Sequence, residues 1–489
     1  MDFINSAKLN CKAAAKTFLL GASLLFFFKF SHAEVVVFNL AGLQDSERVL
    51  NNPDKGWYHH YYDNSLKKYL LKSDSDLDGF PNMQYLFLRF AWCYLEPKEG
   101  EFNWSLIDGA ISKWKTKAIK VAIAVTAQET SEVYAVPKWV VDAGATGGMY
   151  PLLWDKKKKL FEPDYGNPVF LEKLEKLQKA IAERYDGGEN IVSFTIASIG
   201  NWGEGHHLCT SRTAVSVDVI KKHIDIYKKH FKKTPLYIND DLMKYLRTPD
   251  EIRDLREYVE SRKIGYKDDS ILVGTSYAAD PSKKSFLSGE FFDASYDYLP
   301  VVLEMEHYTL SLKSGLWKGK NGSERGADDV REIVEKSRCT YLGYHGEAAK
   351  YLSENPDYVR EMANKLGYWF FVDELVLDTG SGAVEIAWDN RGAARAYEPY
   401  KIFLKFKSAG GKFEKTLRVK GADVCKLHSG KTRQSCFVDF GFLPRGEYEI
   451  YIGMLKTFKN GAKPRPIELG FKESLRGADG FYRLGKVKL

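Results

Sequence analysis

Short apolar runs alternate with amphipathic segments through most of the chain. Eight runs rich in Val, Ile, Leu and aromatic residues have the length and composition of buried strands. Helices are expected between most of them, where apolar residues recur every three or four positions. The predicted strands are 56–62, 85–92, 120–127, 191–199, 235–240, 271–277, 300–308 and 340–346, and the predicted helices are 104–117, 167–185, 217–231, 327–337 and 355–367.

Strands that alternate with helices along a chain usually pair in parallel. Eight such units match a (β/α)8 TIM barrel better than an open, doubly wound sheet. The glycine-rich phosphate fingerprint of dinucleotide-binding folds is also missing from the first strand–helix turn. We therefore expect an α/β fold in which the barrel occupies 34–367.

The pattern changes after about residue 367. Short segments there alternate apolar and polar positions, and Gly, Asp-Asn and Pro-Arg-Gly turns separate them. This pattern is typical of an antiparallel β-sandwich. We expect an Ig-like β-sandwich over 368–489, with strands at 369–378, 383–390, 400–408, 415–421, 436–442, 446–454 and 481–489.

The N-terminal segment 1–33 has the pattern of a secretion signal peptide. Lysines precede a short apolar run at 17–28, and Ser31 and Ala33 supply the small residues of a cleavage site. The mature chain would then begin at Glu34, and no later segment is long and apolar enough to span a membrane. We expect a secreted, periplasmic or cell-surface protein, and the alternative is an uncleaved N-terminal anchor.

Composition and charge exclude several classes of function. The 489 residues are 44% hydrophobic and 28% charged, which is ordinary for a globular chain. The net charge is +7, and removal of the four lysines and one aspartate of 1–33 leaves +4. The densest basic run, 156–159, has no aromatic residues among its lysines, so we expect a solvated loop and no nucleic-acid partner.

Cysteine and histidine spacing gives no metal-binding pattern. Five cysteines remain after removal of 1–33, and none is spaced as CxxC. His206 and His207 are adjacent, so their side chains point to different faces, and no HExxH motif is present. We expect no metal and no organic cofactor. Cys425 and Cys436 flank a hairpin-like loop and could form a disulfide.

Candidate catalytic carboxylates lie at or just beyond the carboxyl ends of two of the predicted strands. Catalytic groups of a TIM barrel lie at the carboxyl ends of its strands. The fourth run leads into SIGNWGEGHH, where Glu204 lies between two glycines, and the seventh run carries Glu304 and Glu306 on one strand face. Glycoside hydrolysis needs two carboxyl groups across the scissile bond, and strands four and seven face each other across the barrel mouth. The alternatives are a loop-capping Glu204 and a structural polar residue at Glu304 or Glu306.

Several motifs together carry a family resemblance. FAWCYLEPKEGEFNW (90–104) is similar to a W-x-x-x-E-P-x-x-G-x-F-x-W stretch of β-galactosidase-like enzymes, and NPDKGWY (52–58) and WGE (202–204) occur in the same order as in a bacterial family of uncharacterised, secreted glycosidase-like proteins. The chain thus resembles the retaining glycosidases of clan A. The resemblance implies that Glu204 is the acid/base and Glu304 the nucleophile, with Glu306 as the rival for the second role.

One departure from the clan A pattern concerns the residue before the acid/base. An Asn that holds the sugar 2-hydroxyl normally precedes this glutamate, whereas here the neighbour is Gly203 and Asn201 lies three residues before Glu204. This departure questions the usual 2-hydroxyl contact.

Other side chains are candidates for substrate binding. Trp57 and Trp202 could stack on a sugar, and Asn239 and Tyr308, at the ends of strands five and seven, could contact it. Arg89 on strand two could keep the nucleophilic carboxylate ionised, or form a buried ion pair.

The function predicted from the sequence is retaining hydrolysis of an oligo- or polysaccharide. Apolar neighbours and the second carboxylate should raise the pKa of Glu204, and the two catalytic carboxyl groups should lie about 5–5.5 Å apart. The alternatives are a catalytically inactive carbohydrate-binding barrel and a polysaccharide-assembly factor. The missing Asn before Glu204 favours the inactive barrel.

Overall fold

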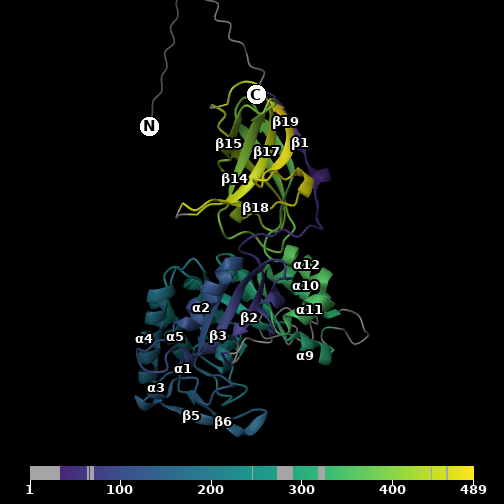
Figure 1. The fold of residues 1–489 in the computed structure, drawn as a ribbon. Helices are drawn as coiled ribbons and strands as arrows, with labels where there is room; N and C mark the ends of the chain where they lie inside the picture. The colour runs from purple at the N-terminus through teal and green to yellow at the C-terminus, as the bar shows by residue number, and fades with distance from the viewer. Residues whose placement is uncertain are drawn as a thin grey trace, which may run out of the picture.

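A computed structural model describes residues 34–62, 65–66, 71–244, 246–271, 290–315, 317, 325–441, 443–458 and 461–489. The predicted signal segment 1–33 lies outside this part. Two bodies are visible, a barrel wrapped by helices and a β-sandwich packed at one end of it (Figure 1).

Eight parallel strands close into a barrel, as predicted. Each strand pairs in parallel with its neighbours in chain order, and the last pairs with the first. The strands are β2 (Gly56–Tyr62), β3 (Met83–Ala91), β4 (Lys120–Thr126), β7 (Ile191–Thr195), β8 (Leu236–Asn239), β9 (Gly265–Ile271), β10 (Val301–Met305) and β11 (Cys339–Tyr344).

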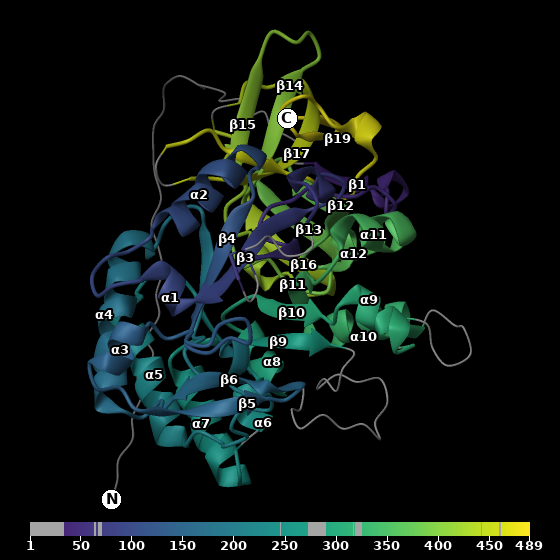
Figure 2. The same ribbon diagram turned by 60° about the horizontal axis from the view of Figure 1, so that its bottom comes forward.

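Helices connect the strands and cover the outside of the barrel (Figure 2). They include all five that the sequence predicts. The helices are α1 (Trp92–Leu95), α2 (Ser105–Trp114), α3 (Lys138–Asp142), α4 (Pro168–Tyr185), α5 (Val217–His230), α6 (Asp241–Lys244), α7 (Pro249–Ser261), α8 (Glu290–Tyr296), α9 (Tyr308–Lys313), α10 (Arg325–Ser337), α11 (Ala348–Glu354) and α12 (Pro356–Lys365).

Local sequence signals explain where the long helices start and stop. The Asn167 side chain accepts hydrogen bonds from the first backbone N–H groups of α4, and Pro168 occupies the first helical position, where no N–H is needed. α12 ends before Gly367, which adopts the left-handed conformation (φ 63°) that glycine tolerates at a helix end.

The sixth barrel strand differs from the prediction. β9 spans Gly265–Ile271 and therefore precedes the predicted run, of which 272–277 lies outside the described residues. Its sequence, GYKDDSI, is polar because Lys267 and Asp269 point toward charged groups inside the barrel rather than toward apolar side chains. A hydrophobic pattern could not identify such a strand.

A β-hairpin between β4 and β7 was also not predicted. β5 (Gly147–Leu152) pairs with β6 (Asp155–Pro163) in antiparallel orientation. The lysine run 156–159, expected to be a loop, therefore belongs to a strand. The hairpin lies at the end of the barrel that is opposite the sandwich (Figure 1).

Two antiparallel sheets form the C-terminal sandwich, as predicted. The first has the order β1-β12-β13-β16, and the second has the order β15-β14-β17-β18 with β19 paired to β17. The strands are β1 (Val35–Asn39), β12 (Phe370–Asp378), β13 (Ala383–Asn390), β14 (Lys401–Ser408), β15 (Glu414–Arg418), β16 (Gly430–Phe437), β17 (Glu447–Lys456), β18 (Arg465–Ile467) and β19 (Tyr482–Lys488).

The sandwich also takes in the first residues that the structure describes. β1 pairs with β12, so Val35–Asn39 belongs to the sandwich and not to the barrel, although the sequence pattern assigned all of 34–367 to the barrel. Cys425 and Cys436 are both free thiols, so the disulfide considered from their spacing is not formed.

The orientation of the barrel determines where a site can lie. Strand-start residues such as Lys120 and Tyr341 line a cavity of about 310 Å³ together with Tyr397 and Glu398 of the segment before β14. The amino ends of the strands thus face the sandwich, and the carboxyl ends open on the far side. Among the described helices, none has both the length and the apolar character of a membrane span.

Candidate active site

Inward-facing residues of the barrel strands change from apolar to charged toward the carboxyl ends. Near the sandwich, the interior is packed with Tyr85, Tyr237, Val302 and Tyr341. Strand periodicity places further inward side chains at every second residue toward the carboxyl end. These side chains form a polar cluster: His60 on β2, Arg89 on β3, Lys267 and Asp269 on β9 and Glu304 on β10.

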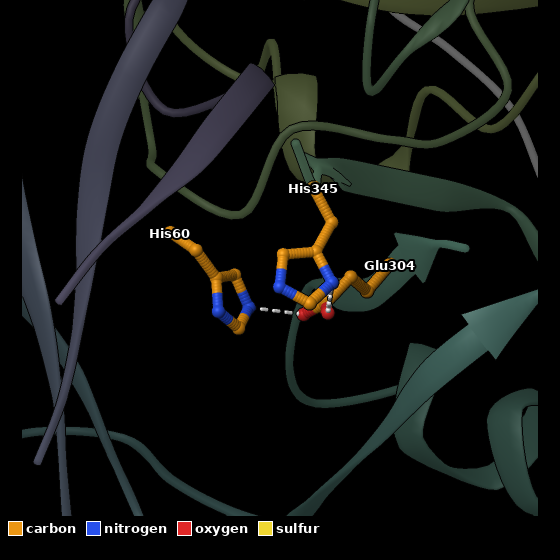
Figure 3. Close-up of side chains that lie close together, drawn as sticks. All are labelled: His60, Glu304 and His345. Carbon is orange, nitrogen blue, oxygen red and sulfur yellow. Dashed lines mark hydrogen bonds and ion pairs between the residues drawn. The ribbon is translucent and has the colours of Figure 1, made fainter. Parts of the chain in front are cut away.

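Glu304 is the most enclosed carboxylate of this cluster, and four side chains surround it. Its side chain is only 2% exposed. Oε2 accepts hydrogen bonds from Tyr58 Oη at 3.2 Å and Lys267 Nζ at 3.3 Å, and it lies 2.5 Å from His60 Nε2. His345 Nδ1 lies 3.3 Å from Oε1, so the two imidazoles flank the carboxylate (Figure 3).

These partners keep Glu304 ionised. Burial alone would raise its pKa, but the positive charge of Lys267 and the hydrogen bond from His60 hold the pKa well below its ordinary value. Burial lowers the pKa of His60 to about 4, so this imidazole is neutral at pH 7. A neutral His60 donates its Nε2 proton to the carboxylate, and among the described residues its Nδ1 has no hydrogen-bond partner.

Glu204 comes from a tight loop rather than from a strand. The loop follows β7, and it contains Gly203 and Gly205, both with positive φ (75° and 86°). A Cβ atom at position 203 would lie 2.5 Å from Ala197, so an Asn cannot replace this glycine without a change of the backbone. The loop geometry therefore explains the departure from the clan A pattern.

Two basic groups contact the Glu204 carboxylate. Arg89 Nη1 lies 2.5 Å from Oε1, and His206 Nε2 lies 3.2 Å from Oε2. Burial would raise the pKa of Glu204, but the hydrogen bond from His206 and the positive charge of Arg89 lower it. The predicted increase of this pKa is therefore wrong, because polar partners rather than apolar neighbours dominate. Arg89 forms an ion pair, but its partner is Glu204 and not the strand-seven carboxylate.

Lys267 links the two glutamates into one cluster. Its ammonium group forms an ion pair with Asp269 and lies 3.3 Å from Glu304, and its charge also lowers the pKa of Glu204. Burial, together with the negative charges of Glu204 and Glu304, raises the pKa of Asp269 despite this lysine. The strand-four and strand-seven carboxylates therefore share one buried set of charges.

Glu306 differs from Glu304 in its environment. Its Oε1 accepts a 2.6 Å hydrogen bond from the His307 backbone N–H. Burial and the nearby charges of Glu304 and Glu204 raise the pKa of Glu306. Of the two strand-seven glutamates, Glu304 is thus the one whose surroundings favour the carboxylate form.

Three predicted contact residues are occupied elsewhere. Trp57 is fully buried, its Nε1 donates to the Val359 carbonyl, and it packs in the core outside the barrel. Tyr308 is buried and donates to Glu354. Asn239 caps its own turn by accepting from the Asp241 N–H. The prediction that Trp57 is a sugar platform is wrong, because β2 turns it toward the helices.

The hydrogen-bonding groups of the Asn201 side chain are likewise occupied by neighbouring loop residues. Its amide donates to Gln128 and Thr210, and its carbonyl accepts from the Cys209 N–H. The residue is fully buried, so it does not replace the Asn expected before Glu204. Trp202 is half-buried in the same loop, and it remains the aromatic side chain beside Glu204.

The sequence analysis missed His60, His345, Tyr58 and Lys267. The first three lie in predicted strands, but nothing in runs such as GWYHHYY shows which face points inward. Lys267 lies in the strand that the hydrophobic pattern missed.

His60, Glu304 and His345 could also hold a metal ion. Their ligand atoms lie within 4.8 Å of one another, and two imidazoles with one carboxylate suit zinc or another divalent transition metal. The 2.5 Å contact between His60 and Glu304 is already satisfied as a hydrogen bond. The two histidines can therefore serve to hold an ionised Glu304, without a metal ion.

Comparison with known proteins gives one family match and two curated relatives. Residues 61–215 match the glycoside hydrolase family 42 model, described as "Beta-galactosidase". The β-galactosidase of Thermus thermophilus is 28% identical over 109 residues, which cover 22% of this chain and 16% of that protein. β-Galactosidase BgaA of a Thermus species is 24% identical over 139 residues, which cover 27% of this chain and 20% of that protein.

Solved structures with similar folds are more distant. A β-galactosidase from Marinomonas ef1 has 13% identity and a TM-score of 0.38, over 64% of this chain and 59% of that one. The catalytic domain of a β-amylase from Paenibacillus polymyxa has 10% identity and a TM-score of 0.43, over 65% of this chain and all of that one. The similarity to the β-galactosidase family model thus covers residues 61–215, the part of the barrel that contains Arg89 and Glu204.

Proposed function

We propose that this chain is a retaining glycoside hydrolase with Glu304 as nucleophile and Glu204 as acid/base. The observation that carries the proposal is the set of side chains around Glu304. Four side chains converge on this buried carboxylate at the carboxyl end of β10 and keep it ionised. Burial favours the neutral form of a carboxyl group, so several converging donors that keep this one ionised are what a nucleophile requires.

The mechanism follows from the two roles. Glu304 attacks the anomeric carbon and forms a glycosyl ester, while Glu204 gives its proton to the departing oxygen. Glu204 then takes a proton from water, and the resulting hydroxide attacks the anomeric carbon and releases the sugar with its original configuration. Tyr58, His60, Lys267 and His345 orient Glu304 and disperse its charge before and after the attack.

Both pKa shifts bear on the pH profile. Charged and hydrogen-bonding partners outweigh burial and lower the pKa of Glu304 and the pKa of Glu204. The productive form, with Glu304 ionised and Glu204 protonated, is therefore populated on the acidic side of neutrality. We propose an enzyme with an acidic optimum.

Substrate and location follow from the comparisons and the N-terminus. The matched relatives are β-galactosidases, but the chain spans only 16% and 20% of their lengths. We propose a β-glycoside substrate, with β-galactosides the first to test. The signal pattern of 1–33 supports an exported enzyme that meets an oligo- or polysaccharide outside the cytoplasm.

The test is hydrolysis of aryl glycosides by the chain from Glu34. Glu304→Gln should lower kcat/KM by roughly 10⁴-fold or more, because the nucleophile is lost. Glu204→Gln should cost about 10²- to 10⁴-fold on phenyl glycosides. It should cost much less on dinitrophenyl glycosides, whose leaving group departs without a proton.

Glu306→Gln is the matched control in the same strand end. It should retain most of the activity, because Glu306 is not in the network around Glu304. If Glu306→Gln abolishes turnover and Glu304→Gln does not, the nucleophile is misassigned. NMR of the first product formed by wild type gives the stereochemistry, and inversion would contradict the mechanism.

One observation favours a second candidate, an inactive carbohydrate-binding barrel. Glu204 is ion-paired with Arg89, and Asn201 is used up in its loop. If wild type hydrolyses no glycoside between pH 3 and pH 7 yet binds glycans, this second function is correct.

A further inference from the structure

The β5–β6 hairpin is fastened to the loop that carries Glu204. Glu162 of β6 accepts hydrogen bonds from Thr210 and Ser211 and lies 3.1 Å from His207 Nδ1. At the other end, the Leu153 N–H donates to the Cys209 carbonyl. The hairpin therefore has a fixed position beside the acid/base, on the open side of the barrel (Figure 2).

The tip of this hairpin holds an exposed tryptophan in a rigid stack. Trp154 is 61% exposed, and its ring is nearly parallel to that of Trp202 (10°), with centroids 6.3 Å apart. Trp202 is itself fixed, because its Nε1 donates to Thr130 and its ring packs against the cluster of Leu152, Leu160 and Cys209.

The stack is coupled to the acid/base by direct contacts. The Trp202 ring meets the His206 ring edge-on at 5.5 Å, and His206 contacts Glu204. A large aromatic surface that is held in place and left in water is ready to bind a flat apolar face at small entropic cost. Sugar rings present such a face, and so a sugar next to the scissile bond would reach this stack.

Basic side chains follow the same hairpin tip along β6. Lys156, Lys157 and Lys159 are exposed, and their ammonium groups have no ion-pair partner among the described residues. Lys158 instead donates to the backbone carbonyls of Thr130 and Ser131, and these hydrogen bonds hold β6 against the loop that follows β4. Strand alternation directs Lys156 to the same side of β6 as Lys158, and it directs Lys157 and Lys159 to the other side. The Asp155 carboxylate, which accepts from the Lys157 N–H, lies at the tip as well. The three lysines outnumber it, so the tip carries a net positive charge that suits a ligand with negative charges.

We propose that Trp154 and the lysines at 156, 157 and 159 form an outer subsite for an anionic polysaccharide, one that carries carboxylate or sulfate groups. The inference rests on the proposed glycosidase function, which it deepens by naming the substrate class. Because the stack adjoins Glu204, which protonates the leaving oxygen, the subsite holds the leaving-group side of the substrate. Trp154 stacks on a sugar ring, and the lysines pair with its anionic substituents.

Affinity electrophoresis tests this subsite without requiring turnover. The Glu304→Gln chain is run through gels that contain polygalacturonate, chondroitin sulfate or neutral galactan. Wild type is run beside it in the cold, so that the result does not depend on one variant. The two anionic gels separate carboxylate from sulfate recognition. We expect retardation by at least one anionic gel, little retardation by galactan, and weaker binding as salt is added.

Two variants and one charge-matched control sharpen the result. Trp154→Ala should weaken binding to the anionic gel about tenfold, which corresponds to about 1.4 kcal/mol. The triple variant Lys156→Ser/Lys157→Ser/Lys159→Ser should weaken it at least as much and remove most of its salt dependence. The control Lys412→Ser/Lys415→Ser/Lys420→Ser makes the same change of net charge on exposed sandwich residues and should bind like the parent.

The outcomes separate this inference from the proposed function. Hydrolysis of aryl glycosides without binding to either anionic gel overturns the subsite and leaves the glycosidase standing. Binding that depends on Trp154 and the lysines, in a chain that hydrolyses nothing, keeps the subsite and overturns the glycosidase. Equal loss of binding in the sandwich control, or equal retardation by galactan, also overturns the subsite.

Discussion

The two sides of the barrel mouth hold their glutamates in different ways. On the strand side, Glu304 is carried by β10, is 2% exposed and contacts side chains from β2, β9 and the end of β11. On the loop side, Glu204 lies beyond β7 in a glycine-rich turn, is 15% exposed and contacts Arg89 and His206.

This difference matches two chemical tasks. A nucleophile must stay ionised and must not move, so attachment to a strand and many fixed donors suit it. An acid/base must gain and lose a proton in each cycle, which requires some access to water and fewer permanent partners.

Trp57→Ala should destabilise the part of the barrel around β2. Trp57 is fully buried on the outer face of β2, whose inner face carries Tyr58 and His60. We expect a loss of about 3–5 kcal/mol in the free energy of unfolding, measured by urea denaturation. The KM of the protein that remains folded should be unchanged. A large rise in KM with unchanged stability would show that Trp57 contacts sugar after all.

Lys267→Met should move the acidic limb of the pH profile. Without this cation the pKa of Glu304 rises, so kcat/KM should start to fall at a pH about 1–3 units higher on the acid side. Lys267→Arg keeps the charge and should shift the limb far less. An acidic limb that does not move in Lys267→Met would mean that this lysine does not hold the nucleophile ionised.

Arg89→Met should move the opposite limb. Loss of the Arg89 charge raises the pKa of Glu204, so the acid/base stays protonated to higher pH and the basic limb of kcat/KM should shift upward by about one unit or more. Arg89→Lys is the charge-conserving control. A shift of the acidic limb instead would assign Arg89 to the nucleophile, which is one of the two roles that the sequence left open for it.

Removal of metal ions should change nothing. The hydrogen bonds of His60 and the contact with His345 already satisfy Glu304, so EDTA should leave kcat within experimental error. Added Zn²⁺ should inhibit, because a metal bound by His60, Glu304 and His345 would occupy the oxygens needed for attack. Loss of activity in EDTA that zinc restores would make this cluster a catalytic metal site.

The barrel was predictable from the sequence because seven of its strands are apolar runs bounded by helices. β9 was misplaced because its inward residues Lys267 and Asp269 serve the site, so the strand lacks the usual apolar signature. The β5–β6 hairpin was missed because its run of four lysines has a composition that is typical of a loop, although it forms part of a strand. Both errors fall on elements that reach the end of the barrel with the candidate site.

The two glutamates of the site were predicted from their positions after strands four and seven. Their protonation was not, because it depends on partners that come from distant strands. Arg89 and Glu204 are 115 residues apart, and His60 and Glu304 are 244 apart. Which face of a fully buried strand points inward is also not encoded in its apolar pattern, and this ambiguity explains the error at Trp57.

The most direct test of the central claim is to trap the covalent intermediate. A 2-deoxy-2-fluoro analogue of the best aryl glycoside slows both steps, and an activated leaving group lets the first step proceed. Peptide mass spectrometry of the inactivated chain should find the fluorosugar as an ester on Glu304. An adduct on Glu306, or no adduct in a chain that turns over the parent glycoside, would contradict the assignment of Glu304 as the nucleophile.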